Sequence, residues 1–386
     1  MPSFLPCSRC VTPAGNLVKT YIVEFSPGEH LSLDEISTDL IRDNFSFWAG
    51  KGTQKTHVTA SVEKTRDDSL FRVRWNYRKK TIDAYFDVEP RRGEHRFWMI
   101  DSLSDASILE SLIEKIVKQS NDVDRVWLWP EFLNVVKSKG RFRSINLAYD
   151  YRDFEEKESH SQEDRYVELE KYLKIDVRGG NEEVLHALEE ILETELLGAK
   201  VVPSKIGIRY EGEEPLAERR SDIFAIEDIK YDGKMVVKGT SIDLHKKLAQ
   251  EIIRRYSSKV REIEKRHTIT LEGENNKIQD VFGEPLYFSF EKKPIENLSQ
   301  FCDVVFSGNY PFGLWGVPEQ IDDGLLVQAV DLQTGSKMNF QIYRDLISLS
   351  LEPKACGNSV VRFFTNIQQT FSCLVIAEDS GGNAIF

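Results

Sequence analysis

The stretch FRVRWNYRKK, residues 71–80, decides how we interpret the first part of this chain. Apolar and polar side chains alternate along it, and a β-strand turns successive side chains to opposite faces. One face of the expected strand enters a hydrophobic core through Phe71, Val73, Trp75 and Tyr77. The other face carries Arg72, Arg74, Asn76 and Arg78. We therefore expect a sheet with one buried face and one cationic face.

Further strands surround this stretch, separated by polar turns. They are expected at Leu17–Phe25, Val58–Val62, Thr81–Val88, Arg96–Ile100 and Val126–Trp129, with a short helix at Ser32–Phe45. Apolar residues from Ile108 to Val117 recur at the three-and-four spacing of a helix, after Ser104 as cap and Asp105 as first-turn acid. Residues 1–160 are accordingly predicted to form an α+β domain, in which an antiparallel sheet packs helices on one face.

An acidic segment, residues 153–170, separates this domain from the rest of the chain. Residues 161–272 are predicted to follow the order β-α-β-β-β-α-β, a ferredoxin-like arrangement plus one strand. Helices are expected at Glu182–Leu197 and after Thr240, and the Asp232-Gly233 pair predicts a tight hairpin turn. Residues 273–386 are predicted to form a third α+β domain, with a loop or bent edge at residues 308–318.

Composition excludes several classes of protein. The 386 residues carry a formal net charge of −12, and 40% of them are hydrophobic, which excludes a disordered chain. The 30% of charged residues and the lack of a long apolar run argue against a membrane protein, and five cysteines are too few for a disulfide framework. We therefore expect a cytoplasmic protein with free thiols. Residues 1–150 sum to about +1, so the acidic excess lies in the remainder.

The cationic face is the first candidate binding site, because open guanidinium and ammonium groups on a strand attract phosphate. The candidate nucleic-acid-binding residues are Arg72, Arg74, Arg78, Lys79 and Lys80, with Arg91 and Arg92 in a nearby turn. An ordinary solvated surface is the alternative, since carboxylates on neighbouring strands, such as Asp83 and Asp87, could pair with the arginines. The sequence leaves both interpretations open.

The segment at residues 308–318, rich in Gly and Pro, contains the second candidate site. Tyr310, Phe312 and Trp315 lie where a loop could expose them, and aromatic side chains are common in protein interfaces. Packing in the core is the commoner use of aromatic residues, and it is the alternative here. We predict that these three residues contact a protein partner.

Signals for metal binding and nucleophilic catalysis are weak. Cys7 and Cys10 have the spacing of half a zinc site, but the other half is missing. His186 and His245 have no Cys, Ser or acid at catalytic spacing, so we interpret them as surface or boundary residues. We expect neither a metal nor a cofactor.

The sequence thus predicts a non-catalytic interaction protein that binds the phosphate backbone of nucleic acid, or an acidic protein, through the cationic face. It would be a subunit of a larger cytoplasmic assembly. The alternative is a metal-dependent enzyme acting on nucleic acid. Its best candidate residues are Asp228, with Asp222, as ligands of Mg²⁺ and Lys230 as a charge stabiliser beside them.

Overall fold

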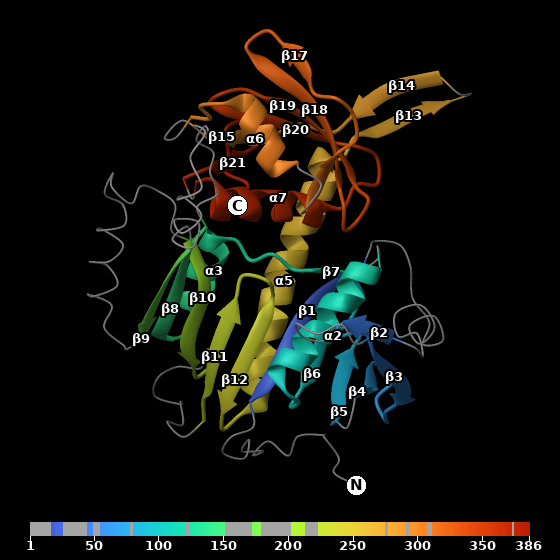
Figure 1. The fold of residues 1–386 in the computed structure, drawn as a ribbon, viewed down its shortest axis with the longest axis vertical. Helices are drawn as coiled ribbons and strands as arrows, with labels where there is room; N and C mark the ends of the chain where they lie inside the picture. Colours follow the sequence, from blue (N-terminus) through green and yellow to red (C-terminus); the bar gives the residue numbers. More distant parts are fainter. Residues whose placement is uncertain are drawn as a thin grey trace. The chain divides into compact units, whose positions relative to one another are not determined.

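The protein is an α+β protein, as the sequence predicts, with mostly antiparallel sheets and five helices among the residues that the structure describes. The structure is a computed structural model (Figure 1). It describes residues 17–25, 45–48, 55–77, 80–120, 123–150, 172–178, 202–212, 223–274, 277–290, 294–306, 311–372 and 374–386.

The chain divides into two compact units, each built from two separate stretches of sequence. Unit 1 comprises residues 1–126 and 209–255, and unit 2 comprises residues 127–208 and 256–386. The domain boundary expected near residue 160 lies outside the described residues. The boundary expected after residue 272 falls inside a strand, β13 (Thr270–Glu274).

Unit 1 is built on a sheet in the order β2-β3-β4-β5-β6-β1-β12-β11, and β7 pairs with β1. The bounds of these strands are β1 Val18–Phe25, β2 Phe45–Trp48, β3 Lys55–Lys64, β4 Leu70–Tyr77, β5 Lys80–Asp87, β6 Phe97–Ser102, β7 Val123–Arg125, β11 Ala225–Lys230 and β12 Lys234–Gly239. The Asp232-Gly233 turn joins β11 to β12 as predicted, and Gly233 has the positive φ of 76° that such a turn requires.

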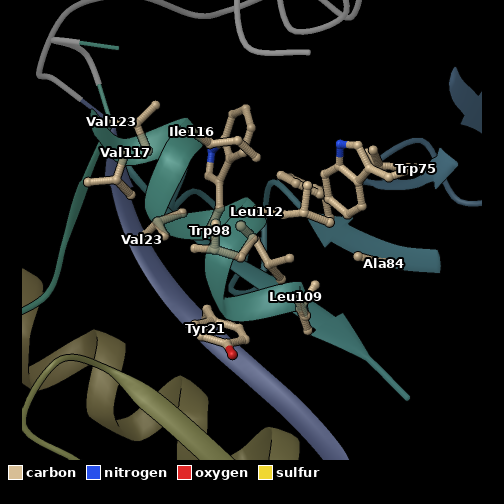
Figure 2. Close-up of a cluster of buried hydrophobic side chains, with 14 of the residues drawn as sticks. Tyr21, Val23, Trp75, Ala84, Trp98, Leu109, Leu112, Ile116, Val117 and Val123 are labelled. Atoms are coloured by element: carbon tan, nitrogen blue, oxygen red, sulfur yellow. The ribbon is translucent and has the colours of Figure 1, made fainter. Parts of the chain in front are cut away.

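One face of this sheet is covered by α2 (Ala106–Gln119). Its apolar residues lie against Trp75 of β4 and Trp98 of β6, both of which are buried (Figure 2). The same buried cluster includes Val73 of β4. The inward face predicted for β4 is therefore confirmed at Phe71, Val73 and Trp75. The carboxylate of Asp105 accepts the N–H of Ser107 at 3.0 Å, so Asp105 is the N-cap, and not the first-turn acid that we expected.

The opposite face is covered near β1 and β11 by the first part of α5 (Ile242–His267), whose buried residues include Leu244, Leu248 and Ile252. Because helices cover both faces of β1, all eight of its residues are buried. A strand buried on both faces cannot show polar and apolar alternation. This explains why polar residues such as Thr20 and Glu24 lie inside the protein.

Unit 2 contains a strand group in the order β10-β8-β9 and a seven-stranded sheet in the order β16-β18-β19-β20-β15-β21, with β17 also paired to β18. The bounds are α3 Pro130–Lys137, β8 Arg141–Asp150, β9 Tyr172–Arg178, β10 Val202–Tyr210, β14 Lys277–Phe282, β15 Leu286–Ser289, α6 Leu298–Val305, β16 Phe312–Leu314, β17 Glu319–Ile321, β18 Gly324–Asp331, β19 Lys337–Ile342, β20 Leu346–Leu351, α7 Gly357–Thr370 and β21 Ile376–Glu378.

The core of the seven-stranded sheet is aromatic. Phe363 of α7 lies 5.2 Å from Phe288 of β15 and 4.9 Å from Phe340 of β19, measured between ring centroids. Tilted and edge-on ring pairs of this kind add favourable electrostatics to the burial of apolar area. Strands β13 and β14 form a separate two-stranded hairpin that projects from the rest of unit 2 (Figure 1).

One predicted strand is wrong, and two predicted helices cannot be compared with the structure over most of their length. The strand expected at Val126–Trp129 is wrong, because the pairing with β1 ends at Arg125 and the four residues that follow are irregular. The helix expected at Glu182–Leu197, and the one at Ser32–Phe45 up to residue 44, lie outside the described residues. The ferredoxin-like order therefore stays a prediction. Within the described part of the chain, no helix has the length and apolar character needed to cross a membrane.

Candidate functional site

The arginines of β4 project from the polar face of the strand, as predicted, but carboxylates meet them there. Arg72 Nη2 lies 2.8 Å from Asp83 Oδ2, and Arg74 Nε lies 3.0 Å from Asp83 Oδ1. Glu63 on β3 lies 3.6 Å from Arg72 and 3.5 Å from Arg74. Two guanidinium groups therefore face two carboxylates across three neighbouring strands.

This network keeps its charges. Burial by itself would raise the pKa of Asp83, but hydrogen bonds from both arginines outweigh it, and the net pKa lies below its usual value. The hydrogen bond to Asp83 likewise raises the pKa of Arg72. Our expectation of open cations is wrong for Arg72 and Arg74, because carboxylates on β3 and β5 lie directly opposite them. Nucleic-acid binding itself stays a prediction.

Of the remaining candidate cations, the structure describes Lys80, Arg91 and Arg92. Arg78 and Lys79 lie outside the described residues. Lys80 is exposed at the start of β5, and Arg91 and Arg92 are exposed in the turn after it. The described polar face around β4 and β5 carries more carboxylates than cations: Glu63, Asp83, Asp87 and Asp101 against Arg72, Arg74 and Lys246. Such a face repels phosphate more than it attracts it.

The paired arginines lead to a first prediction. Replacing Arg72 and Arg74 together with Gln is expected to change the affinity for single- and double-stranded nucleic acid by less than about twofold, because partly exposed, internally paired cations release few counterions. The measurement is a titration of labelled nucleic acid over a salt series. A matched double variant, Glu63→Gln, Asp83→Asn, removes both carboxylates that face the guanidinium groups and should increase the salt dependence. Loss of affinity and of salt slope in the variant without the two arginines would contradict this prediction.

A buried polar chain lies on the α5 face of unit 1. His245 Nδ1 lies 3.0 Å from both carboxylate oxygens of Glu227, and His245 Nε2 lies 2.7 Å from Thr20 Oγ1. The Thr20 hydroxyl in turn donates to Asp101 at 2.5 Å. Thr20, Glu227 and His245 are fully buried. Our interpretation of His245 as a surface or boundary residue is therefore wrong.

The hydrogen-bond partners of the ring favour its protonated form. Thr20 has a single hydroxyl proton and gives it to the Asp101 carboxylate, which leaves the Thr20 oxygen as an acceptor for His245 Nε2. The Glu227 oxygens are acceptors for Nδ1, so an imidazolium, with a donor on each nitrogen, matches both neighbours. Burial alone would lower the pKa of His245, but the Glu227 carboxylate raises it above its ordinary value. The Thr20 hydroxyl is buried and donates its proton to Asp101, so Thr20 is not positioned to act as a nucleophile. We therefore interpret this row of hydrogen-bonded side chains as a structural feature.

The second candidate site, in the segment at residues 308–318, lies at the edge of the seven-stranded sheet. Strands β16 and β17 both pair with β18, and the segment at residues 315–318 connects them. Trp315 is 61% exposed and Val317 is 86% exposed, and Leu332, which lies over Gly313 on the same face of β16, is 49% exposed. We call these three residues the edge patch. The exposure predicted for Trp315 is confirmed.

The other two aromatic residues behave differently. Phe312 is fully buried, and its ring lies 5.6 Å from that of Phe363 on α7, so the prediction that it contacts a partner is wrong. Phe312 shares the inward face of the sheet with Asp331, its register partner on β18. Tyr310 lies outside the described residues.

The structure holds Trp315 in place although its side chain is exposed. Its backbone N–H donates to the carbonyl of Gln328 at 2.8 Å, and Lys337 Nζ lies 4.1 Å from the centroid of its ring. A Cβ on Gly313 would come within 3.1 Å of Leu332, so the absence of a side chain at Gly313 lets Leu332 lie down over β16. The edge patch is a fixed apolar surface.

The surroundings of the edge patch carry few charges. Glu319, Asp322 and Asp323 are exposed on β17 and the turn that follows it, and Lys337 lies over Trp315. The exposed positions of β18 and β19 on the outward face are Gln328 and Gln341. The patch therefore has a neutral polar border and an acidic end.

Of the residues weighed for metal chemistry, the structure describes Asp228 and Lys230. Asp228 and Lys230 share one face of β11, as expected, but Lys230 Nζ lies 3.8 Å from Glu110 of α2. Cys7, Cys10 and Asp222 lie outside the described residues. In the part of the chain that the structure describes, no group of three or more His, Cys, Asp and Glu residues could hold a metal ion.

Comparisons with known proteins identify a family. A relative from Methanocaldococcus jannaschii, described as uncharacterized protein MJECL33, is 32% identical over 180 residues, which cover 46% of this chain and 41% of the relative. The match therefore spans less than half of the relative's length. No solved structure matches the chain. The model of the MJECL33-like protein family matches residues 8–380, and the chain belongs to this family.

Proposed function

We propose that the protein is a non-catalytic interaction protein that binds another protein through the edge patch, as a subunit of a larger assembly. The observation that carries this proposal is the exposure of Trp315 on a fixed backbone. Exposing a large aromatic side chain costs free energy, and clustered exposed apolar residues mark interaction surfaces. Tryptophan is also the residue type most enriched among those that dominate binding energy in protein interfaces.

Charge favours a protein over a nucleic acid at this surface. A protein that stacks bases on a tryptophan also needs a positive groove that follows the phosphates. The edge patch instead ends at Glu319, Asp322 and Asp323, and the cation described against Trp315 is Lys337. Carboxylates in this position repel a phosphate backbone.

The same charges define the partner. An apolar side chain of the partner would cover Trp315 and Val317, and Lys or Arg residues beside it would face the acidic end of the patch. Strands β16 and β17 have only three residues each. Because such short strands offer few backbone groups for a ladder, we infer that recognition rests on side chains.

The proposal is tested first by locating the partner. A photo-reactive amino acid at position 317, introduced in the native host, is expected to crosslink one protein in stoichiometric amount, through a segment that contains apolar and basic residues. The same probe at Leu271, an exposed residue of the projecting hairpin, is the control. Crosslinking to nucleic acid, or to a second copy of this chain alone, would contradict the proposal.

Truncation of the tryptophan is then expected to weaken binding. Against the purified partner, Trp315→Ala should lose about 2 kcal/mol or more, which is roughly a thirtyfold rise in Kd, because a central aromatic anchor is removed. The measurement is isothermal titration calorimetry. Leu271→Ala is the matched control and should leave Kd within about twofold. Equal affinities for Trp315→Ala and the wild type would show that the edge patch is not the contact.

A further inference from the structure

The hydroxyl of Tyr21 is a buried polar group with no hydrogen-bond partner among the described residues. Tyr21 lies on β1, is 2% exposed, and belongs by its ring to the apolar cluster under α2. Figure 2 shows its oxygen pointing away from the labelled apolar side chains. Buried hydroxyl groups normally have a partner, because leaving one without a hydrogen bond forfeits its hydration. A bound ligand could supply the hydrogen-bond partner that the Tyr21 hydroxyl lacks among the described residues.

Charged side chains surround this hydroxyl. Lys234 of β12 is the register partner of Tyr21, and its Nζ lies 5.5 Å from the centroid of the Tyr21 ring. Lys234 pairs with Glu110 of α2, and Lys230 Nζ lies 3.8 Å from the same carboxylate. Each ammonium group has three donors, so this one carboxylate leaves donors on both lysines available.

Cations and carboxylates alternate around the Tyr21 hydroxyl. Arg125 of β7 pairs with Asp232 at 3.1 Å, and both influence the pKa of the Tyr21 hydroxyl. Burial is the main reason that this pKa is raised, with the carboxylates of Glu110 and Asp232 adding to it. Lys19 adds a further cation close to Lys234, and Asp105 lies near it. Four cations and four carboxylates thus lie on this face of the sheet: Lys19, Arg125, Lys230 and Lys234 with Glu110, Asp105, Asp232 and Asp228, which shares the Lys230 face of β11.

From this arrangement we infer that unit 1 has a phosphate-binding site, in which the Tyr21 hydroxyl and the amines of Lys230 and Lys234 donate to the oxygens of one phosphate group. A phosphate oxygen accepts several hydrogen bonds at once, and those from ammonium groups are charge-assisted and therefore strong. The free lysine donors and the hydroxyl converge from three adjacent strands, β1, β11 and β12. This site is separate from the edge patch and does not depend on the proposed function.

The test compares wild type and Tyr21→Phe in inorganic phosphate and in chloride of equal ionic strength. In chloride, Tyr21→Phe should be at least as stable as the wild type, because it removes a hydroxyl without a partner. In phosphate, the thermal midpoint of the wild type should rise with concentration, as expected for a ligand that binds only the folded state. Tyr21→Phe should weaken phosphate binding about tenfold, as loss of a hydrogen bond to a charged group does. A phosphate monoester, phenyl phosphate, tested in parallel distinguishes free phosphate from an ester as the ligand.

Two control variants separate a built site from general attraction. Tyr85→Phe removes a hydroxyl from the opposite face of the sheet, and Lys238→Gln removes an exposed charge from β12 itself. Both should bind phosphate within about twofold of the wild type. A wild type that gains no stability from phosphate, a Tyr21→Phe variant that binds it equally well, or a Lys238→Gln variant that loses as much would each overturn the inference. A structure in phosphate showing only an ordered water on Tyr21 would do the same.

Discussion

Replacement of His245 by leucine is expected to destabilise unit 1 by about 3–5 kcal/mol, the typical cost of leaving a buried charge without its partner. His245 and Glu227 are both fully buried, so His245→Leu leaves the Glu227 carboxylate in an apolar environment without the imidazolium that faces it. The loss should appear as faster amide hydrogen exchange in β1 and β11, the strands that carry Thr20 and Glu227. Exchange is the appropriate measurement because a chain with two units has no single unfolding transition to rely on.

A second substitution tests whether the loss comes from the charge. The double variant His245→Leu, Glu227→Leu should regain most of the protection, because apolar residues of similar volume often replace a buried ion pair without loss of stability. His95→Gln, at an exposed position, is the control and should stay within about 0.5 kcal/mol of the wild type. If the double variant were no more stable than His245→Leu, the network would act through shape and not through charge.

The same network predicts how the stability of unit 1 depends on pH. The pKa of His245 is raised in the folded protein, so its contribution is fully present below the ordinary value of 6.5 and is lost as pH rises through the folded value. The free energy of opening β1 should therefore fall as the solution is made alkaline. In the double variant that lacks both His245 and Glu227, this part of the pH dependence should be absent.

Asp331→Asn is expected to destabilise unit 2 by a similar amount, about 3–5 kcal/mol. Asp331 of β18 forms an ion pair with Arg362 of α7, and both side chains are buried. Burial raises the pKa of Asp331 to about 6, which still leaves its carboxylate mostly ionised at neutral pH. Asparagine keeps an oxygen for the N–H of Gln333 but removes the charge, and a guanidinium group cannot lose its proton to compensate.

The loss should be measured by hydrogen exchange in α7 and β18. Asp345→Asn, at an exposed site of the same unit, should leave exchange unchanged within about 0.5 kcal/mol. The double variant Asp331→Asn, Arg362→Met removes both charges and should recover part of the loss. Wild-type protection in Asp331→Asn alone would mean that the pair contributes nothing to the anchoring of α7.

The sequence allowed the prediction of elements whose pattern is local. Alternation identified β4 over the observed residues Leu70–Tyr77, and the three-and-four spacing identified α2. The short strands β16 and β17 were missed because three residues cannot show a period. The edge that they form exists because β18 pairs with β17 across the turn at Asp322-Asp323 and with β16, whose partners lie 15 to 19 positions away. The second pairing leaves no trace in a short stretch of sequence.

The sequence predicted which side chains of the candidate site point outward, because this follows from the alternation along a strand. It did not predict which residues they pair with. The outward direction of Arg72 followed from period two, but its pairing with Asp83 depends on the register between β4 and β5, which the sequence leaves open. The network at His245 could not be found in this way. Its members come from three strands and a helix, and they are separated by up to 225 positions along the chain.

The broken edge formed by β16 and β17 also bears on how the protein behaves in concentrated solution. A long flat edge offers a continuous row of backbone donors and acceptors, on which further chains can assemble into fibrils. Here residues 315–318 interrupt the row after three residues, so an incoming strand finds no continuous ladder to extend. The protein can therefore keep an exposed tryptophan at the rim of a sheet without seeding aggregation from that rim.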